Sequence, residues 1–261
     1  MLRLGLKLLL GLFVIGVLLV TYEYLNLPDV GKLKSGNPRT TALMQIRDQQ
    51  QLRKGLKPLR RQLWVSYGSF GDAIKRAVIL GEDTGFFSHQ GVDLFELKEA
   101  VKDDLERGRF KRGGSTITMQ LARNLYLSPE KSLLRKVREI MIAFEMERVL
   151  SKQRIMEIYL NVAEWGPGLY GAEAAAQHYF SKPALSLTPG EAATLAALLP
   201  SPLGSKDRDL MRRRNTILKR MLSTGAISPS EFEQIKDQPP FPRANGDAEP
   251  SDSAPAQDEA S

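Results

Sequence analysis

Ten residues in the first half of the chain, 82–91, have the sequence EDTGFFSHQG. They follow an amphipathic segment and combine an acidic pair with two aromatic residues, a histidine and a glycine. A carboxylate at the end of a helix, beside rings that exclude water, has its pKa raised toward neutrality, which suits a general base. Glu82 is therefore a candidate base. The alternative is a solvated helix cap, and only the sequence beyond this stretch separates the two.

A second stretch, residues 112–124, has the sequence RGGSTITMQLARN. Its adjacent glycines would let the backbone approach a ligand and turn its N–H groups toward an anion. Taken alone, Gly-Gly-Ser-Thr is typical of an ordinary loop. Neutral donors and fixed positive charge accompany the glycines, at Ser115, Thr116, Gln120, Arg112 and Arg123.

A third stretch, residues 131–139, has the sequence KSLLRKVRE and is predicted to open a helix. Basic residues precede Glu139 by about one and two helical turns, so in isolation the pattern also fits a salt-bridged helix face. Apolar residues recur at helical spacing and predict a buried stripe, formed by Leu133, Leu134, Val137, Ile140, Met141 and Phe144.

A fourth stretch, residues 152–161, has the sequence KQRIMEIYLN, and GLYGAEAA follows at 168–175. In order and spacing, the four stretches resemble the motifs of the peptidoglycan glycosyltransferases, glycosyltransferase family 51. The resemblance runs from about Gly71 to Pro202, half of the chain. Each motif alone is weak, whereas four in the family's order are specific. The short chain and NVAEWG at 161–166 are most similar to the monofunctional biosynthetic members.

The helix signals along the chain predict a mainly α fold, with one N-terminal transmembrane helix before the domain. The resemblance further implies a lysozyme-like helical domain with a smaller membrane-facing lobe. It also implies lipid II as the substrate, which is polymerised through β-1,4 bonds with release of undecaprenyl pyrophosphate. No transpeptidase activity is expected. The Ser-x-x-Lys at 128–131 matches penicillin-binding enzymes by chance, because no Ser-Asp-Asn or Lys-Thr-Gly follows it.

The resemblance also assigns the site. Glu82 matches the general base, and Glu139 matches a second carboxylate that stabilises charge or orients the reacting groups. A divalent cation, magnesium or manganese, is allowed at this carboxylate, and no organic cofactor is expected. The positions that match the family's substrate-binding residues are Asp83, Gly114, Ser115, Thr116, Gln120, Arg123, Lys131, Arg135 and Lys136.

Two positions depart from the family's pattern. Lys131 stands where arginine is more usual, which keeps the charge but loses the bidentate fork of a guanidinium. Met119 replaces a commonly paired glutamine, which leaves Gln120 as the expected contact.

Several conspicuous side chains are given structural roles. His89 is expected to hold its turn through a hydrogen bond, His178 to pack on its helix, and Glu157 to pair with Lys152 or Arg154. Two histidines so far apart in sequence predict no metal site. Four arginines in a later helix are predicted to form a solvated or membrane-facing surface, namely Arg208, Arg212, Arg213 and Arg214.

The 261 residues fit one catalytic domain with appendages. The chain has no cysteine, which excludes disulfides, a thiol nucleophile and thiolate metal ligands. Residues 1–243 contain 37 basic against 25 acidic residues, a net charge of +12, whereas the remainder contains five acidic residues and no Lys or Arg. Such a body favours anionic lipid or a pyrophosphate substrate. Nucleic acid is not expected as a partner, because no groove-reading motif is present.

Residues 8–22 form a continuous uncharged stretch after Arg3 and Lys7. With snorkelling of Lys7, it approaches the ~20 residues of a membrane span. A cleaved signal peptide is the alternative, but no small-x-small cleavage site follows, and Tyr22 and Tyr24 fit an interfacial aromatic belt. We predict an uncleaved single-pass anchor in the bacterial inner membrane, with the catalytic domain in the periplasm.

Four segments are predicted. They are a cytoplasmic tip with the transmembrane anchor (1–27), a linker with a basic membrane-proximal segment (28–59), the glycosyltransferase domain (60–235) and a disordered acidic tail (236–261).

Helix starts are predicted at Asp72, at Asp93 for a helix to Gly108, and at Ser128-Pro129. Thr188 and Ser228 begin two predicted capping boxes, and residues 64–67 predict a short strand.

Two other functions use the same residues. A lysozyme-like hydrolase also needs two carboxylates, but it needs no cation cluster around the second one. The basic residues near Glu139 therefore favour a pyrophosphate leaving group. A non-catalytic scaffold of cell-wall synthesis would not need both glutamates. Expected partners are lipid II, the growing glycan strand and the membrane, and other cell-wall synthesis proteins are allowed.

Overall fold

The structure, a computed structural model, describes residues 2–94, 98, 114–130, 132–204 and 207–242. The protein is mainly helical, as predicted. The α-helices are α1 (Leu2–Leu25), α2 (Ala42–Arg53), α3 (Asp72–Glu82), α5 (Ile117–Tyr126), α6 (Leu133–Val149), α7 (Lys152–Val162), α8 (Ala172–Phe180), α9 (Pro189–Leu198), α10 (Asp207–Ser223) and α11 (Pro229–Ile235). Short 3-10 helices are η1 (Val30–Lys34), η2 (Tyr67–Ser69) and η3 (Ala184–Ser186).

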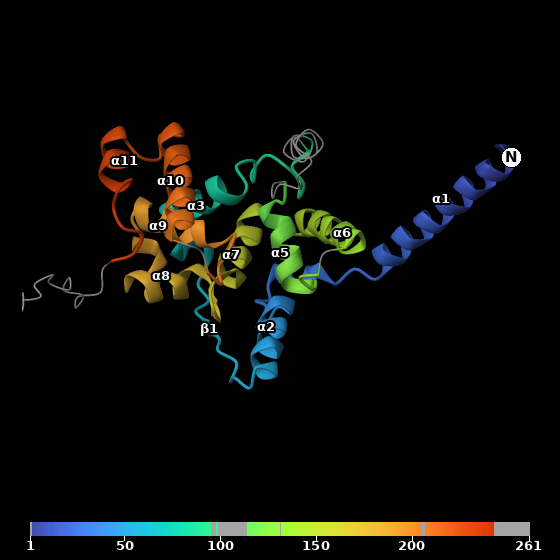
Figure 1. The fold of residues 1–261 in the computed structure, drawn as a ribbon, viewed down its shortest axis with the longest axis horizontal. Coiled ribbons are helices and arrows are strands. Elements are labelled where there is room, and N and C mark those ends of the chain that lie inside the picture. Colours follow the sequence, from blue (N-terminus) through green and yellow to red (C-terminus); the bar gives the residue numbers. More distant parts are fainter. Residues whose placement is uncertain (1, 95–97, 99–113, 131, 205–206, 243–261) are drawn as a thin grey trace, which may run out of the picture.

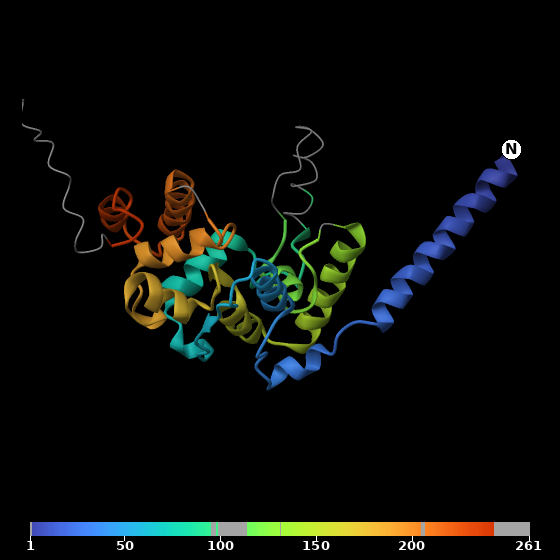
Figure 2. The ribbon, with the colours of Figure 1, turned by 60° about the horizontal axis from the view of Figure 1, so that its bottom comes forward.

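The helices of the body form two neighbouring groups (Figure 1). In one group α3 packs on α9 and α10, and α10 contacts α11. In the other, α5 packs on α6 and α2, while α7 contacts α5, α6 and α8 and so connects the two groups. Helix α1 projects away from the body in both ribbon views (Figures 1 and 2). Because Glu82 ends α3 and Gln120 lies on α5, the two groups meet at the candidate site.

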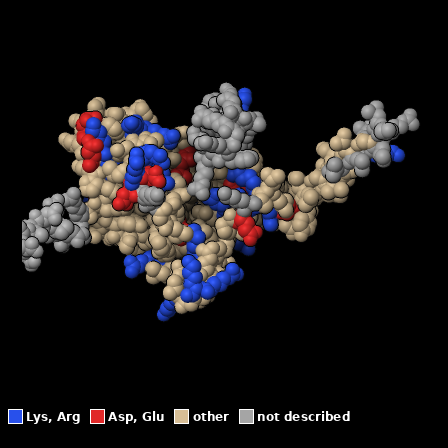
Figure 3. Space-filling view, in the orientation of Figure 1, with Lys and Arg blue, Asp and Glu red and all other residues tan. Residues whose placement is uncertain are grey.

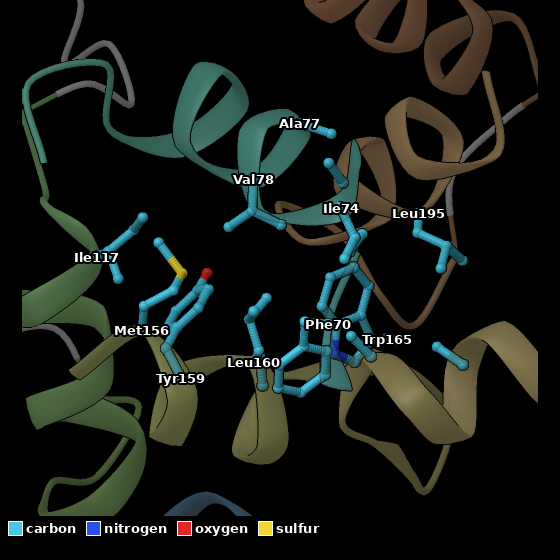
Figure 4. Packing of buried hydrophobic residues seen from close by; sticks show 14 of the residues in the cluster. Phe70, Ile74, Ala77, Val78, Ile117, Met156, Tyr159, Leu160, Trp165 and Leu195 are labelled. Carbon is cyan, nitrogen blue, oxygen red and sulfur yellow. The ribbon is translucent and has the colours of Figure 1, made fainter. Parts of the chain in front are cut away.

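One hydrophobic core joins these helices. Figure 4 shows side chains of α3, α5, α7 and α9 directed into a common interior. Helix α7 is deeply buried, because seven of the eight residues from Ile155 to Val162, all except Glu157, are buried. Full burial of a side chain such as Phe70 stabilises the fold by roughly 1.5–3 kcal/mol.

A three-stranded sheet with the order β1-β3-β2 contacts α8. Its strands are β1 (Arg61–Gln62), β2 (Glu164–Gly166) and β3 (Leu169–Tyr170). β1 pairs with β3 in parallel, Arg61 opposite Leu169, and β2 pairs with β3 antiparallel. The strand predicted at 64–67 is wrong by about three residues. Asn161 donates to the Val65 carbonyl and accepts from the Val65 amide, both at 2.9 Å, so the Val65 backbone has no groups left for a sheet ladder.

Most helices begin at a side-chain cap. The capping boxes at Thr188 and Ser228 are confirmed, each with proline in the first turn. The start predicted at Ser128-Pro129 is wrong, because α6 begins at Leu133, where Ser132 accepts from the Arg135 amide at 3.0 Å. Asp72 is the first residue of α3 rather than its cap. The helix predicted from Asp93 to Gly108 lies almost entirely outside the described residues.

The predicted buried stripe of α6 is also wrong. Leu133 is 88% exposed and Phe144 is 50% exposed, whereas the residues buried on this helix are Glu139, Ile142, Ala143 and Met146. The face of α6 that packs on the protein differs from the predicted one. Its charged residues lie toward α5, and Lys136 donates to Ser115 just before that helix. The exposed apolar side chains of α6 are Leu133, Leu134, Val137 and Phe144.

The segment predicted as a linker and basic segment, residues 28–59, contacts the body. Val30, Leu33 and Met44 are buried, and Arg47 forms an ion pair with Glu164 at 2.9 Å. Exposed basic side chains follow α2 and lie at the lower tip of the molecule in Figure 3. These residues are Arg53, Lys54, Lys57, Arg60 and Arg61.

Within the described part of the chain, no helix is both long enough and apolar enough to cross a membrane. The last turn of α1 contacts α6, where Glu23, a buried residue, forms an ion pair with Arg138 at 2.8 Å.

Candidate functional site

Glu82 ends α3 and is half-buried. Gln120, on α5, donates from Nε2 to Glu82 Oε2 at 2.8 Å. The Tyr159 hydroxyl of α7 donates in turn to Gln120 Oε1 at 3.1 Å, which fixes which end of the amide faces the carboxylate. The predicted contact residue Gln120 thus lies beside the predicted base and orients it.

Opposing influences act on the pKa of Glu82. Burial raises the pKa, and the neighbouring Asp83 carboxylate adds to the rise. The Gln120 hydrogen bond and the positive charges of Arg123 and Arg213 lower it, but burial dominates, so the pKa lies above its ordinary value. A carboxylate with a raised pKa is a stronger base once ionised, which is the property that proton abstraction needs.

Asp83 and His89 hold the loop that follows Glu82. The Gly91 amide donates to His89 Nδ1 at 3.1 Å, so the ring proton is on Nε2, which lies 2.9 Å from Asp83 Oδ1. The Ile117 amide at the start of α5 donates to Asp83 Oδ2 at 2.9 Å. The structural role predicted for His89 is confirmed. Asp83 is buried in this network, and its substrate contact stays a prediction.

The Gly-Gly-Ser-Thr motif leads into α5, with its first glycine outside the described residues. Gly114 has φ +83°, a left-handed conformation that favours glycine. Thr116 caps α5 by accepting from the Met119 amide at 3.2 Å, and its hydroxyl donates to the Gly91 carbonyl at 2.6 Å. Ser115 accepts from Lys136 Nζ at 2.8 Å. The motif therefore connects the loop of Glu82 to helix α6.

Glu139 is fully buried on α6 and is held by two cations. Lys136 Nζ donates to Oε1 at 2.7 Å, and Arg135 donates to Oε2. One buried carboxylate with two basic groups leaves a local excess of positive charge, which favours a bound anion. Lys131, the third predicted cation of this helix, lies outside the described residues. Arg123 lies half-buried on α5 on the Glu82 side of the site.

The divalent cation allowed at Glu139 stays a prediction. Both carboxylate oxygens accept from basic side chains. In the described part of the chain, no group of three or more His, Cys, Asp or Glu side chains is placed to hold a metal ion.

Glu157 pairs with Arg154, as predicted, and also accepts from the Tyr67 amide at 2.9 Å. A second polar network joins three helices beside the site. Glu147 accepts from Thr118 at 2.5 Å and from Lys152 at 2.7 Å, and the Lys152 ammonium lies 4.6 Å from the centre of the Phe86 ring. This network was not predicted. It fixes the fourth motif against the first.

The prediction for the arginines of α10 is wrong at two positions. Arg214 is 1% exposed and donates to the carbonyl oxygens of Ile235, Lys236 and Gln238, which closes the end of α11. Arg213 lines a hollow of about 150 Å³ together with Glu82. Arg208 and Arg212 are exposed, as predicted. Helical spacing could have found Arg214, because it shares a face with Leu210, Ile217 and Leu218.

The chain is similar to known proteins over the segment that contains this site. The Transglycosylase family model matches residues 48–222, which include every described site residue above. The chain is 41% identical over 194 residues to a biosynthetic peptidoglycan transglycosylase of Thiobacillus denitrificans, covering 73% of this chain and 84% of that protein. It is 40% identical over 228 residues to the protein of the same name from a Janthinobacterium strain, covering 85% and 97%.

A crystal structure of penicillin-binding protein 1A from Haemophilus influenzae covers 69% of this chain with a TM-score of 0.40 at 22% identity, and the chain covers 18% of that protein. A similarity of this size supports no conclusion. The family match spans more than half of the chain and contains both glutamates, the Gly-Gly-Ser-Thr motif and the cations of α6. The chain belongs to the transglycosylase family.

Proposed function

We propose that this protein polymerises lipid II into glycan strands and has no transpeptidase activity. The observation that carries the proposal is that two carboxylates in different environments lie on helices next to the α5 segment. Glu82 is half-buried, with a raised pKa and an amide donor. Glu139 is fully buried and neutralised by two cations. One carboxylate is suited to accept a proton, and the other organises positive charge.

The proposed reaction gives each carboxylate a different role. Glu82 takes the proton from the 4-hydroxyl of the acceptor sugar, and that oxygen forms a bond to the anomeric carbon of the donor. The bond from this carbon to the pyrophosphate oxygen breaks, and undecaprenyl pyrophosphate leaves with the electron pair. Arg123, Arg135 and Lys136 are the described cations that would meet the growing negative charge. Glu82 then releases its proton to water.

A hydrolase is the second candidate, but the charges disfavour it. Cleavage of a sugar–sugar bond needs an acid that protonates the leaving oxygen. Around Glu139 the structure offers basic side chains in fixed hydrogen bonds, and these suit an anionic leaving group better than a neutral sugar. A role for magnesium or manganese stays a prediction, and the steps proposed above need none.

We further propose that α1 anchors the protein in the bacterial inner membrane, with the catalytic domain in the periplasm. The uncharged residues 8–22 of α1 support an anchor, and the described apolar side chains in this stretch are exposed. The exposed apolar side chains of α6 support a smaller lobe that faces the membrane. The partners proposed are therefore lipid II, the glycan strand and the membrane, and no nucleic acid.

Incubation of the purified protein with labelled lipid II tests the activity. Products are separated by size, and Glu82→Gln serves as the matched inactive control. Polymer that forms with the wild type and not with the variant supports the proposal. Short fragments from preformed glycan would support the hydrolase, and unchanged lipid II in every detergent would support a scaffold.

A further inference from the structure

A small hollow lies beside Glu82 where α3, α9 and α10 meet. Its apolar wall is formed by α9 and by Ile217, which packs so closely on Gly81 that an added Cβ would lie 3.1 Å from its Cδ1 atom. Its charged side chains are Glu82, Arg213 and Arg220. Neither arginine belongs to the four sequence motifs, so α10 brings charge to the base from outside them.

The two arginines differ in their contacts. Arg220 is exposed and donates to the Leu80 carbonyl near the end of α3. Arg213, two turns earlier, is half-buried, and its charge lowers the pKa of Glu82. Arg213 therefore acts on the carboxylate itself, whereas Arg220 contacts the backbone that carries it.

Glu82 needs a nearby positive charge because burial and the Asp83 carboxylate oppose its ionisation. Burial raises its pKa, and Asp83 on the same loop raises it further. Tyr159 of α7 has its own pKa raised well above the ordinary value, so it stays neutral and adds no charge of either sign. On the other side, α5 contributes the Gln120 hydrogen bond and Arg123, and α10 contributes Arg213. Each helix group therefore contributes one cation near Glu82: Arg123 from α5 and Arg213 from α10.

We propose that Arg213 is a positioning residue for glycosyl transfer, which acts through Glu82 by holding its carboxylate in the charged form that accepts a proton. The proposal rests on the proposed function, because it needs Glu82 to be the base. Arg123 has a second role in the proposed function, because it would also bind the leaving pyrophosphate. Arg213 lies on the α10 side, so its effect is expected to pass through the carboxylate alone.

The test is the pH dependence of kcat/KM for polymerisation of labelled lipid II by the full-length protein. Arg213→Gln is expected to move the acidic limb to higher pH while the activity above the limb stays close to that of the wild type. Each unit of displacement lowers the activity below the limb about tenfold. Arg213→Lys is expected to restore most of the wild-type profile. Arg212→Gln, which removes an exposed charge paired with Asp209, is the matched control and is expected to leave the limb in place.

An acidic limb that does not move in Arg213→Gln would overturn the proposal, as would a loss of the same size at every pH, which indicates a direct substrate contact. If the glutamine variant does not fold, Arg213→Met keeps the aliphatic stem and is held to the same outcomes. A wild type without polymerase activity would instead refute the proposed function.

Discussion

Replacing Lys136 by methionine tests whether the positive charge on α6 acts in catalysis. Lys136 Nζ lies between Ser115 Oγ at 2.8 Å and Glu139 Oε1 at 2.7 Å, so two hydrogen bonds hold its charge in place. Methionine keeps an aliphatic stem and removes the charge. Glu139, which is fully buried, then keeps Arg135 as its basic partner among the described residues.

Two magnitudes follow. Loss of one preorganised electrostatic group typically lowers turnover by ~10²–10³-fold, or about 3–4 kcal/mol of barrier. The stability loss is smaller, because Arg135 still compensates Glu139 and because the Lys136 side chain is 33% exposed, so solvent screens its charge. We expect about 1–2 kcal/mol. The variant should therefore fold and fail in turnover.

The assay measures turnover of lipid II at low and high salt, with thermal unfolding as the check on folding. Arg213, although basic, is no control because it lines the hollow beside Glu82. The control is Arg212→Met, because Arg212 lies beside Arg213 on α10 and its side chain is 76% exposed. Equal losses in both variants, similarly changed by salt, would show that the basic residues act only as a diffuse field and would refute the placement of the pyrophosphate.

Four further predictions concern the base, its pH dependence, the anchor and α11. Glu82→Gln is expected to lower polymer formation by roughly 10²–10⁴-fold in a folded protein, because the amide cannot accept a proton; polymerisation at the wild-type rate would contradict the base. Since burial raises the pKa of Glu82 and only the ionised form is a base, wild-type kcat/KM is expected to fall on acidification at a higher pH than an ordinary glutamate would give. Removal of residues 1–27 is expected to leave a soluble or loosely associated protein with residual activity on detergent-solubilised lipid II; a folded but inactive product in every detergent would mean that α1 does more than tether. Arg214→Leu is expected to lower the free energy of unfolding by about 1–3 kcal/mol in urea titrations, because the hydrogen bonds from one buried guanidinium to three carbonyl oxygens are lost; unchanged stability would contradict this role.

Local features of the chain were predictable. The capping boxes at Thr188 and Ser228 and the pair of Glu157 with Arg154 connect residues three apart in sequence. His89 bonds within its own turn, to Asp83 and Gly91. Such contacts depend mainly on the local backbone conformation, which residue types and spacing already specify.

The orientation of α6 was not predictable from its own sequence. Hydrophobic spacing pointed to Leu133, Leu134 and Val137, all of which are exposed. The helix buries a carboxylate instead, because Arg135 and Lys136 neutralise it and Ser115 on another segment completes the cluster. A pattern of apolar residues indicates which face of a helix is hydrophobic. It does not indicate whether protein or another apolar surface covers that face.

The amino-acid sequence by itself determined the family, the two glutamates, the helical class and the local caps, because ordered motifs and short-range hydrogen bonds are written along the chain. Only the tertiary structure decided which groups surround Glu82. Gln120, Tyr159 and Arg213 come from three different helices: Gln120 donates to the carboxylate, Tyr159 donates to Gln120, and Arg213 lines the hollow beside Glu82. The ionisation of a buried carboxylate depends on the sum of these distant charges and dipoles, and their positions exist only once the helices have packed.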